Sequence, residues 1–228
     1  MTRSPSPRSL LATRPPSAWP ALHAIVDVEV AARAGWTPLD YAAALLDGGA
    51  TFLQVRAKHL SSGEFLRHCD DIVERARSCD ATVIVNDRVD LALLSGAAGA
   101  HVGQEDLSVA DARRLLGDDA VVGYSTHTPD QIDSGAASTA SYLAVGPVFG
   151  TTTKDTGYQA VGLDMVRAAC RATARPVVAI GGVTLENAAM ALDAGATMVA
   201  VISDLLVGGD PTARVRAYVK ALADRRRV

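Results

Sequence analysis

The chain has 228 residues, of which 49% are hydrophobic, so it can form one large α/β domain and general disorder is excluded. Its formal net charge of −3 excludes a global basic field for nucleic acid or an anionic membrane, so an anionic ligand must be bound by a local site. The three cysteines match no metal or disulfide pattern and no apolar run reaches the roughly 20 residues of a bilayer span, so we expect a soluble, cytoplasmic protein.

The first twenty residues differ in composition from the rest of the chain. They include Arg3, Arg8 and Arg14, five prolines and no acidic residue. Such a segment buries too little apolar surface to offset its ordering entropy, so residues 1–20 are predicted to be a disordered tail before a catalytic domain at 21–228. A transit peptide is the alternative, because transit peptides are also rich in Arg and Ser, but the prolines oppose the amphipathic helix that one would form.

Short apolar runs then alternate with helical patterns. The runs are His23–Val26, Thr51–Val55, Thr82–Val85, Ala100–Val102, Val121–Val122, Tyr142–Val145, Val177–Ile180 and Met198–Val201. They predict buried parallel strands because they are continuously apolar. Helices are expected over Glu64–Arg77, where apolar residues form a one-sided stripe, and over Thr184–Ala194 and Pro211–Asp224. Eight such units predict an α/β fold with a single (β/α)8 TIM barrel; an open doubly wound sheet is the alternative, but polar residues after almost every run favour closure.

The active site of a TIM barrel is built at the carboxyl ends of its strands, so the residues after each run are the candidates. After the second run, Gln54, Arg56 and Lys58 stand at alternate positions and share one side of an extended segment. Two cations and an amide that point the same way form an anion clamp, with Arg as a planar fork and Lys as a mobile charge. A solvated charged turn is the alternative interpretation.

Carboxylates follow the next two runs. The third run ends in Asn86-Asp87, and the fourth leads into His101–Asp106. Because neighbouring strands lie about 4.8 Å apart, Asp87 and Asp106 are predicted to converge above the barrel. Two carboxylates suit Mg²⁺, which keeps waters and takes phosphate oxygens at its other positions. Either Asp alone would more often be a helix N-cap; the pair beside a cationic clamp favours a metal–diphosphate site.

The fifth run leads to Ser125 and His127. Ser125 either binds a substrate or caps the following helix, and the sequence leaves a structural and a functional role equally open for His127. No Gly-x-Ser-x-Gly motif surrounds Ser125, so the nucleophile elbow of a serine hydrolase is not expected.

Phosphate-binding features follow the last three runs. The loop after the sixth run carries three threonines and Lys154 between glycines, and its length is typical of a lid, although an exposed polar loop is the alternative. The seventh run ends at Gly181-Gly182 and the eighth at Ile202-Ser203. The turns after these two strands are the usual phosphate site of a TIM barrel. The pattern therefore predicts a metal-bound diphosphate beside a monophosphate.

Together these segments resemble the thiamine-phosphate synthase family. The resemblance covers about residues 21–224, and it is carried by the combination of Gln54–Lys58, Asn86-Asp87, His101–Asp106, Gly146–Lys154, Ile180–Val183 and Ile202-Ser203. It implies that an aminopyrimidine diphosphate is bound by Gln54, Val55, Arg56, Ala57, Lys58, Asn86, Ser125 and Lys154. It implies that a thiazole phosphate is bound by Thr151, Thr152, Thr153, Gly182, Ile202 and Ser203, and that Mg²⁺ is bound by Asp87 and Asp106. The family often has Pro where this chain has Gly150, which should loosen the loop without removing a ligand-binding group.

The resemblance implies a Mg²⁺-dependent transferase that joins the two rings and releases diphosphate. Catalysis would fall to Arg56, Lys58, Ser125 and Lys154. Diphosphate leaves first, and the resulting pyrimidine cation is attacked by the thiazole nitrogen, which already has a lone pair and needs no base. Catalysis then consists of positioning and of stabilising the leaving anion.

Two other functions fit a barrel that binds phosphate. A thiazole tautomerase would bind the thiazole phosphate, but it would need an acid/base residue and no diphosphate clamp. A non-catalytic phosphate sensor would leave the two carboxylates without a purpose, and neither composition nor an interaction tail supports it. We expect small-molecule substrates as partners and neither nucleic acid nor a membrane; the sequence leaves a homo-oligomer open.

Overall fold

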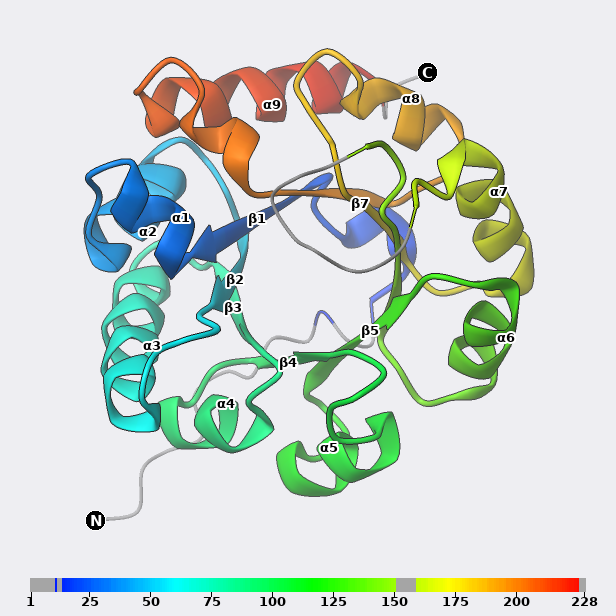
Figure 1. The fold of residues 1–228 in the computed structure, drawn as a ribbon, viewed down its shortest axis with the longest axis horizontal. Helices are drawn as coiled ribbons and strands as arrows, with labels where there is room; N and C mark the ends of the chain where they lie inside the picture. Colours follow the sequence, from blue (N-terminus) through cyan, green and yellow to red (C-terminus); the bar gives the residue numbers. More distant parts are fainter. Residues whose placement is uncertain (1–10, 12–13, 151–158, 226–228) are drawn as a thin grey trace.

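The computed structural model of the protein describes Leu11, residues 14–150 and residues 159–225. Within these residues eight parallel strands pair in chain order and close into a barrel, with the last strand hydrogen-bonded to the first. The strands are β1 (Leu22–Asp27), β2 (Phe52–Arg56), β3 (Thr82–Asn86), β4 (Gly99–Val102), β5 (Val121–Thr126), β6 (Tyr142–Val145), β7 (Val177–Ile180) and β8 (Met198–Val201). Figure 1 shows the helices arranged around this ring of strands. The predicted (β/α)8 TIM barrel is confirmed.

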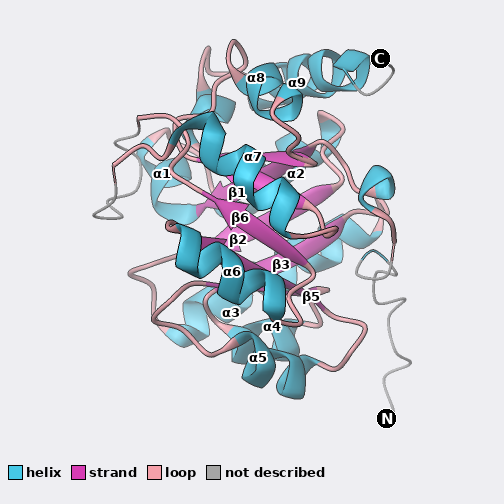
Figure 2. Ribbon diagram, turned by 90° about the vertical axis from the view of Figure 1, so that its right-hand side faces the viewer, coloured by secondary structure: helices cyan, strands magenta, loops and turns pink. Residues whose placement is uncertain are grey.

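Helices cover the outer side of the barrel, which Figure 2 shows from another side. They are α1 (Val28–Arg33), α2 (Pro38–Asp47), α3 (Ser62–Arg77), α4 (Val89–Ser95), α5 (Val109–Leu116), α6 (Pro129–Ala137), α7 (Gly162–Ala172), α8 (Ala188–Asp193) and α9 (Pro211–Arg225). The 3-10 turns η2 (Pro16–Ala18) and η3 (Ser203–Leu206) lie before β1 and after β8. α3 begins at a capping box, in which Ser61 and Glu64 satisfy each other's backbone N–H groups. In the described part of the chain, no helix combines the length and the apolar character that a bilayer crossing requires.

Two element ends differ from the sequence prediction. β5 continues past Val122 to Thr126, because residues 123–126 pair in register with β6. α8 begins at Ala188 rather than at Thr184, because the Thr184 N–H donates to the Asn187 Oδ1 at 2.8 Å and residues 184–187 form a turn. Ser125 therefore lies within a strand and not in the loop that follows it.

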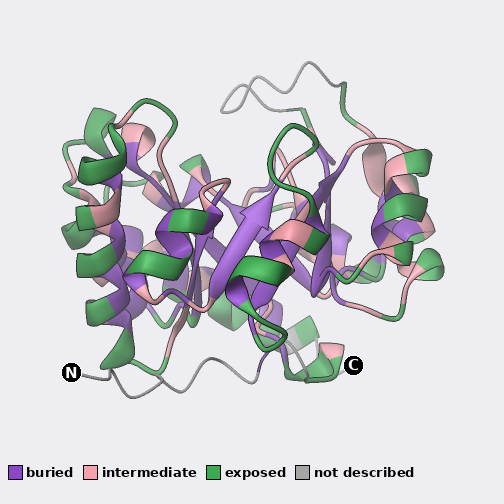
Figure 3. Cartoon of the chain, turned by 90° about the horizontal axis from the view of Figure 1, so that it is seen from below, coloured by how far each residue is buried: buried purple, intermediate pink, exposed green. Residues whose placement is uncertain are grey.

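The hydrophobic core has one part between the strands and the helices and a second part inside the barrel. Figure 3 shows the buried strands, with helices that are buried on their inner sides and exposed on their outer sides. Inside the barrel, large side chains such as Phe52, Ile84, Tyr142 and Met198 form a separate cluster. A TIM barrel is closed in this way because strand residues alternate between the interior and the helices.

Residues before β1 belong to this inner cluster. Trp19 is only 1% exposed, and its ring centroid lies 5.8 Å from those of both Phe52 and Tyr142. Leu11 is buried in the same cluster. The boundary expected at residue 20 is therefore corrected for two residues: Leu11 and Trp19 pack in the barrel's inner cluster, because an indole buries enough apolar surface to order a short polar segment. Residues 1–10 and 12–13 lie outside the described residues.

The register between β1 and β2 sets which side chains meet inside the barrel. Ile25 pairs with Gln54, and Asp27 pairs with Arg56. Since successive residues of a strand point to opposite faces, His23, Ile25 and Asp27 share one face of β1. These residues and the alternate residues of β2 form the wall on which the site is built.

Candidate active site

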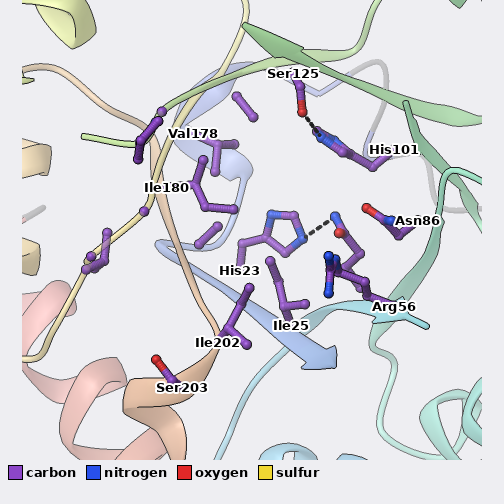
Figure 4. A pocket seen from close by; sticks show the side chains of 18 of the residues that line it. His23, Ile25, Arg56, Asn86, His101, Ser125, Val178, Ile180, Ile202 and Ser203 are labelled. Atoms are coloured by element: carbon purple, nitrogen blue, oxygen red, sulfur yellow. Dashed lines mark hydrogen bonds between the residues drawn. The ribbon is translucent and has the colours of Figure 1, made fainter. Parts of the chain in front are cut away.

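A cavity lies at the carboxyl ends of the strands and reaches into the barrel (Figure 4). The space between its walls is about 860 Å³ with the open mouth included. One wall is polar and comes from β2 to β5, with the side chains of Gln54, Arg56, Asn86, His101 and Ser125. The opposite wall comes from the ends of β6 to β8, with Pro147, Ile180, Gly181, Gly182, Val183, Ile202 and Ser203.

Arg56 forms the cationic part of the polar wall. Its Nη1 donates to the Asp27 Oδ2, and the two side chains are only 12% and 2% exposed. The other Asp27 oxygen accepts the Val30 N–H at 2.9 Å and caps α1, so the carboxylate is held from two sides. The Arg56 Nε is buried and has no hydrogen-bond partner among the described residues. The guanidinium is thus fixed at one edge and has a buried N–H donor at Nε that is unpaired among the described residues.

Lys58, Asp87 and Asp106 form a second cluster beside the cavity. The Lys58 Nζ lies 2.5 Å from the Asp87 Oδ2. Asp106 lies close enough to Asp87 for the two carboxyl groups to shift each other's pKa, and its Oδ2 accepts the Gly103 N–H at 2.7 Å. These residues do not line the cavity itself, but Lys58 follows the cavity residue Arg56 by two positions. The predicted convergence of Asp87 and Asp106 is therefore present in the structure.

The two carboxylates have opposite pKa shifts. Burial raises the pKa of Asp87, but the hydrogen bond and charge of Lys58, together with the hydrogen bond to Asp106, outweigh burial and hold it below its usual value. Burial raises the pKa of Asp106, and the charge of Asp87 adds to this against the lowering effect of the Gly103 N–H. Such a split is what two carboxylates sharing one site produce, and a bound cation would relieve their repulsion.

The ligand chemistry of this pair fits Mg²⁺. The described residues contain no group of three or more His, Cys, Asp or Glu side chains that could enclose a metal ion. A cation at Asp87 and Asp106 would therefore keep most of its coordination positions for water and phosphate oxygens. This is the usual arrangement of Mg²⁺ at phosphate-binding sites, because the ion dehydrates reluctantly.

A buried hydrogen-bond chain stands behind Ser125. The His101 Nε2 lies 2.8 Å from the Ser125 Oγ, and the His101 Nδ1 lies 2.8 Å from the Tyr142 hydroxyl. Gly123 makes room for this chain, because a Cβ at that position would come within 2.5 Å of the His101 Nδ1. Burial raises the pKa of Tyr142 well above its usual value, so the phenol stays neutral and remains a hydrogen-bond donor. The chain fixes where the Ser125 hydroxyl lies in the cavity wall.

The glycine turn after β7 forms part of the opposite wall. Gly181 and Gly182 have φ angles of 95° and 65°, which side chains other than glycine rarely adopt. A Cβ at Gly182 would also lie 2.8 Å from the Phe149 Cβ, so only glycine fits there. The Asn187 Nδ2 donates to the Gly182 carbonyl at 2.9 Å and holds the turn.

Asp204 joins this turn to the end of β8. It is 8% exposed and accepts the Leu185 N–H at 3.2 Å, the Tyr218 hydroxyl at 2.5 Å and the Arg214 guanidinium at 2.8 Å. Since Asp204 directly follows Ser203, this network fixes the backbone beside a cavity residue. The turns after β7 and β8 are therefore held as one unit.

The structure brings seven of the predicted site residues to one cavity: Gln54, Arg56, Asn86, Ser125, Gly182, Ile202 and Ser203. Val55 is placed elsewhere, because its side chain is fully buried between the strands and the helices, and Ala57 packs against the same core. Thr151, Thr152, Thr153 and Lys154 lie outside the described residues. His127 lines the cavity, and its Nδ1 lies 2.5 Å from the Gly146 carbonyl oxygen, a contact that positions the start of the loop after β6.

Three features of the site were not found by sequence reasoning. His23 and Ile25 line the cavity from β1, and Asp27 holds Arg56. The first apolar run predicts a core strand, because most of its residues are apolar. A signal was present, since His23 and Asp27 are polar and stand four positions apart in an otherwise apolar run, which places them on one face of the strand.

A closed (β/α)8 barrel with a cavity at the carboxyl ends of its strands defines the chain as a TIM-barrel protein. The model of the thiamine monophosphate synthase family matches residues 22–205, and the chain belongs to this family. The resemblance inferred from the sequence segments is thus confirmed.

Individual relatives agree with the family assignment. The chain is 43% identical over 205 residues to the thiamine-phosphate synthase of Koribacter versatilis, which covers 89% of this chain and 96% of the relative. It is 40% identical over 192 residues to that of Haloarcula marismortui, with 83% and 91% covered. The solved thiamine phosphate pyrophosphorylase of Pyrococcus furiosus superposes with a TM-score of 0.82 at 26% identity and covers 96% of this chain and 99% of that one.

Proposed function

We propose that this chain is a Mg²⁺-dependent transferase that couples an aminopyrimidine carrying a diphosphooxymethyl group to a thiazole carrying a phosphooxyethyl group, giving thiamine phosphate and diphosphate. One observation carries the proposal. A single cavity has a polar wall with a buried cationic donor on one side and a glycine turn with Ser203 on the other. This arrangement suits two anionic substrates that must meet between the walls. The names of the curated relatives support the same reaction.

The diphosphate is assigned to the side of Arg56 and Lys58. The Arg56 Nε is a buried donor, and Lys58 supplies a mobile charge that is 42% exposed and can follow a leaving group. The resemblance to the family assigns Lys154 to the diphosphate as well, and this residue lies outside the described residues. Asp87 and Asp106 would hold Mg²⁺, which when bound supplies positive charge against the departing diphosphate. The residues thus stabilise negative charge that develops as the carbon–oxygen bond breaks.

The ring systems are assigned to the inner part of the cavity. Gln54 and Ser125 hydrogen-bond the aminopyrimidine and orient its methylene carbon, while Ile25, Ile180 and Ile202 supply apolar surface that excludes water. The pyrimidine cation left by diphosphate is then captured by the thiazole nitrogen. The phosphate of the thiazole substrate is assigned to Gly182, Ser203 and the threonines of the loop after β6. The attacking nitrogen carries no proton, so the chain needs no general base in this step.

Incubation of the protein with both substrates tests the proposal. We expect thiamine phosphate and diphosphate in equal amounts with Mg²⁺, and a loss of both products with excess chelator. Thiamine phosphate formation that continues undiminished in chelator would remove the metal from the mechanism. Isomerisation of the thiazole phosphate without coupling would instead identify a tautomerase.

A further inference from the structure

His23 is a fully interior histidine that lines the cavity from β1. Its side chain is 2% exposed, and it is one of the cavity residues in Figure 4. The ring stands edge-on to Phe52, with 4.7 Å between ring centroids and an interplanar angle of 90°. These contacts hold the plane of the imidazole. The position of His23 in the cavity is therefore set by the barrel and not by a loop.

The hydrogen bond to Gln54 indicates which nitrogen of His23 carries the proton. Burial, and to a smaller extent the nearby His101, lower the pKa of His23 well below its usual value, so the ring is neutral near pH 7. A neutral imidazole has one N–H donor and one acceptor nitrogen. The Gln54 Nε2 lies 3.3 Å from the His23 Nε2, and an amide NH₂ can only donate. The His23 Nε2 is then the acceptor, and the proton is on Nδ1.

The Nδ1 of His23 has no hydrogen-bond partner among the described residues. A buried N–H donor that is left unpaired is unfavourable, and native proteins contain few of them. The contrast with His101 is informative, because that ring uses Nδ1 for Tyr142 and Nε2 for Ser125. Both ring nitrogens of His101 are engaged within the protein, whereas His23 lines the cavity and has one nitrogen engaged by Gln54 and one buried nitrogen unpaired among the described residues.

We propose that His23 is a ligand-binding residue whose Nδ1–H donates a hydrogen bond to a ring nitrogen of the aminopyrimidine. The inference rests on the proposed function and identifies His23 as a side chain that recognises the aminopyrimidine ring. A ring nitrogen of the aminopyrimidine has a lone pair and no proton, so it is a neutral acceptor of the kind that a neutral imidazole N–H requires.

Nitrogen NMR of the protein labelled with 15N-histidine tests the tautomer and the contact directly. We expect His23 to be protonated at Nδ1 in the free protein, and the Nδ1–H proton resonance to move downfield when the aminopyrimidine diphosphate is added with Mg²⁺. Addition of inorganic diphosphate should leave this resonance in place, since it occupies only the cationic side. Protonation at Nε2, or an unchanged Nδ1–H resonance at saturating pyrimidine, overturns the proposal.

Binding measurements on variants provide a second test. His23→Leu removes the donor and should weaken binding of the aminopyrimidine diphosphate about tenfold while leaving the affinity for inorganic diphosphate unchanged. His23→Asn places an amide nitrogen near the position of Nδ1 and should recover part of the loss. His68→Leu, on the outer helix α3, is the matched control and should bind like the unaltered protein. Equal losses for both ligands in His23→Leu, or no loss at all, would refute a specific contact to the ring.

These results separate this inference from the proposed function. A protein that binds the aminopyrimidine diphosphate through His23 but forms no thiamine phosphate would refute the coupling reaction and leave the His23 contact standing. A protein that forms thiamine phosphate with an unperturbed His23 would do the reverse.

Discussion

The ion pair between Arg56 and Asp27 allows the catalytic and the structural roles of Arg56 to be separated. Both side chains are almost completely buried, so removing the guanidinium leaves a carboxylate without its partner inside the barrel. Arg56→Met should therefore lower the free energy of unfolding by about 3 kcal/mol. It should also lower kcat by about 100- to 1000-fold, because the variant loses a preorganised donor to the leaving diphosphate.

The double variant Asp27→Asn/Arg56→Met removes both charges and keeps the side-chain oxygen that caps α1. We expect it to recover most of the lost stability in urea unfolding followed by tryptophan fluorescence, and to recover none of the lost coupling activity. Arg167→Met is the matched control, since Arg167 pairs with Asp164 on the surface and should change stability by less than about 0.5 kcal/mol with full activity. A double variant that regains activity together with stability would show that Arg56 acts only through the fold.

Three further predictions concern the metal pair, the serine and the buried histidine. Asp106→Asn removes one of two carboxylates and should raise the Mg²⁺ concentration for half-maximal activity by more than about tenfold, as read from a Mg²⁺ titration; an unchanged titration would exclude Asp106 as a ligand. Ser125→Ala should lower kcat/KM by about 10- to 100-fold, the effect of a lost hydrogen bond, whereas a loss on the order of a millionfold would identify Ser125 as a nucleophile activated by His101. The lowered pKa of His23 means that the unfolded chain takes up a proton below about pH 6.5 that the folded chain does not, so stability falls as the pH falls. Between pH 7.5 and 5.5 the native protein should lose about 1 kcal/mol more than His23→Leu in urea unfolding, and parallel losses would contradict a neutral buried ring.

The strands were predictable because they are buried on both faces. A parallel strand inside a TIM barrel has the barrel interior on one side and helices on the other, so its sequence is continuously apolar and stands out between helices. The sequence does not predict the end of β5, because residues 123–126 are Gly, Tyr, Ser and Thr and do not continue the apolar run. Trp19 was missed because composition averaged over twenty residues hides one large aromatic side chain that packs against Phe52.

The site was predictable where it depends on strand order and unpredictable where it depends on register. Asp87 and Asp106 follow neighbouring strands, and barrel closure brings such positions together whatever the detailed pairing. The contact of Arg56 with Asp27 requires the register of β1 against β2, and no local sequence pattern specifies that register. Val55 belongs to the segment Gln54–Lys58 that is predicted to bind the aminopyrimidine diphosphate, yet the pleat of the strand turns its side chain into the core between the strands and the helices.

Barrel closure also explains why the side chain of Arg56 is held rigidly whereas that of Lys58, two residues later, is partly exposed. Arg56 is the last residue of β2 and is held by Asp27 of the neighbouring strand, so its position follows from the hydrogen-bond register of the sheet. Lys58 lies two residues beyond the strand, where its backbone N–H is held by Glu29 at 2.8 Å while its side chain remains 42% exposed. In the proposed reaction, the fixed guanidinium would orient the diphosphate, and the more exposed ammonium, paired with Asp87 in this structure, would interact with it as the carbon–oxygen bond lengthens. The two cations are therefore not interchangeable, because one position demands a buried planar fork and the other a flexible charge.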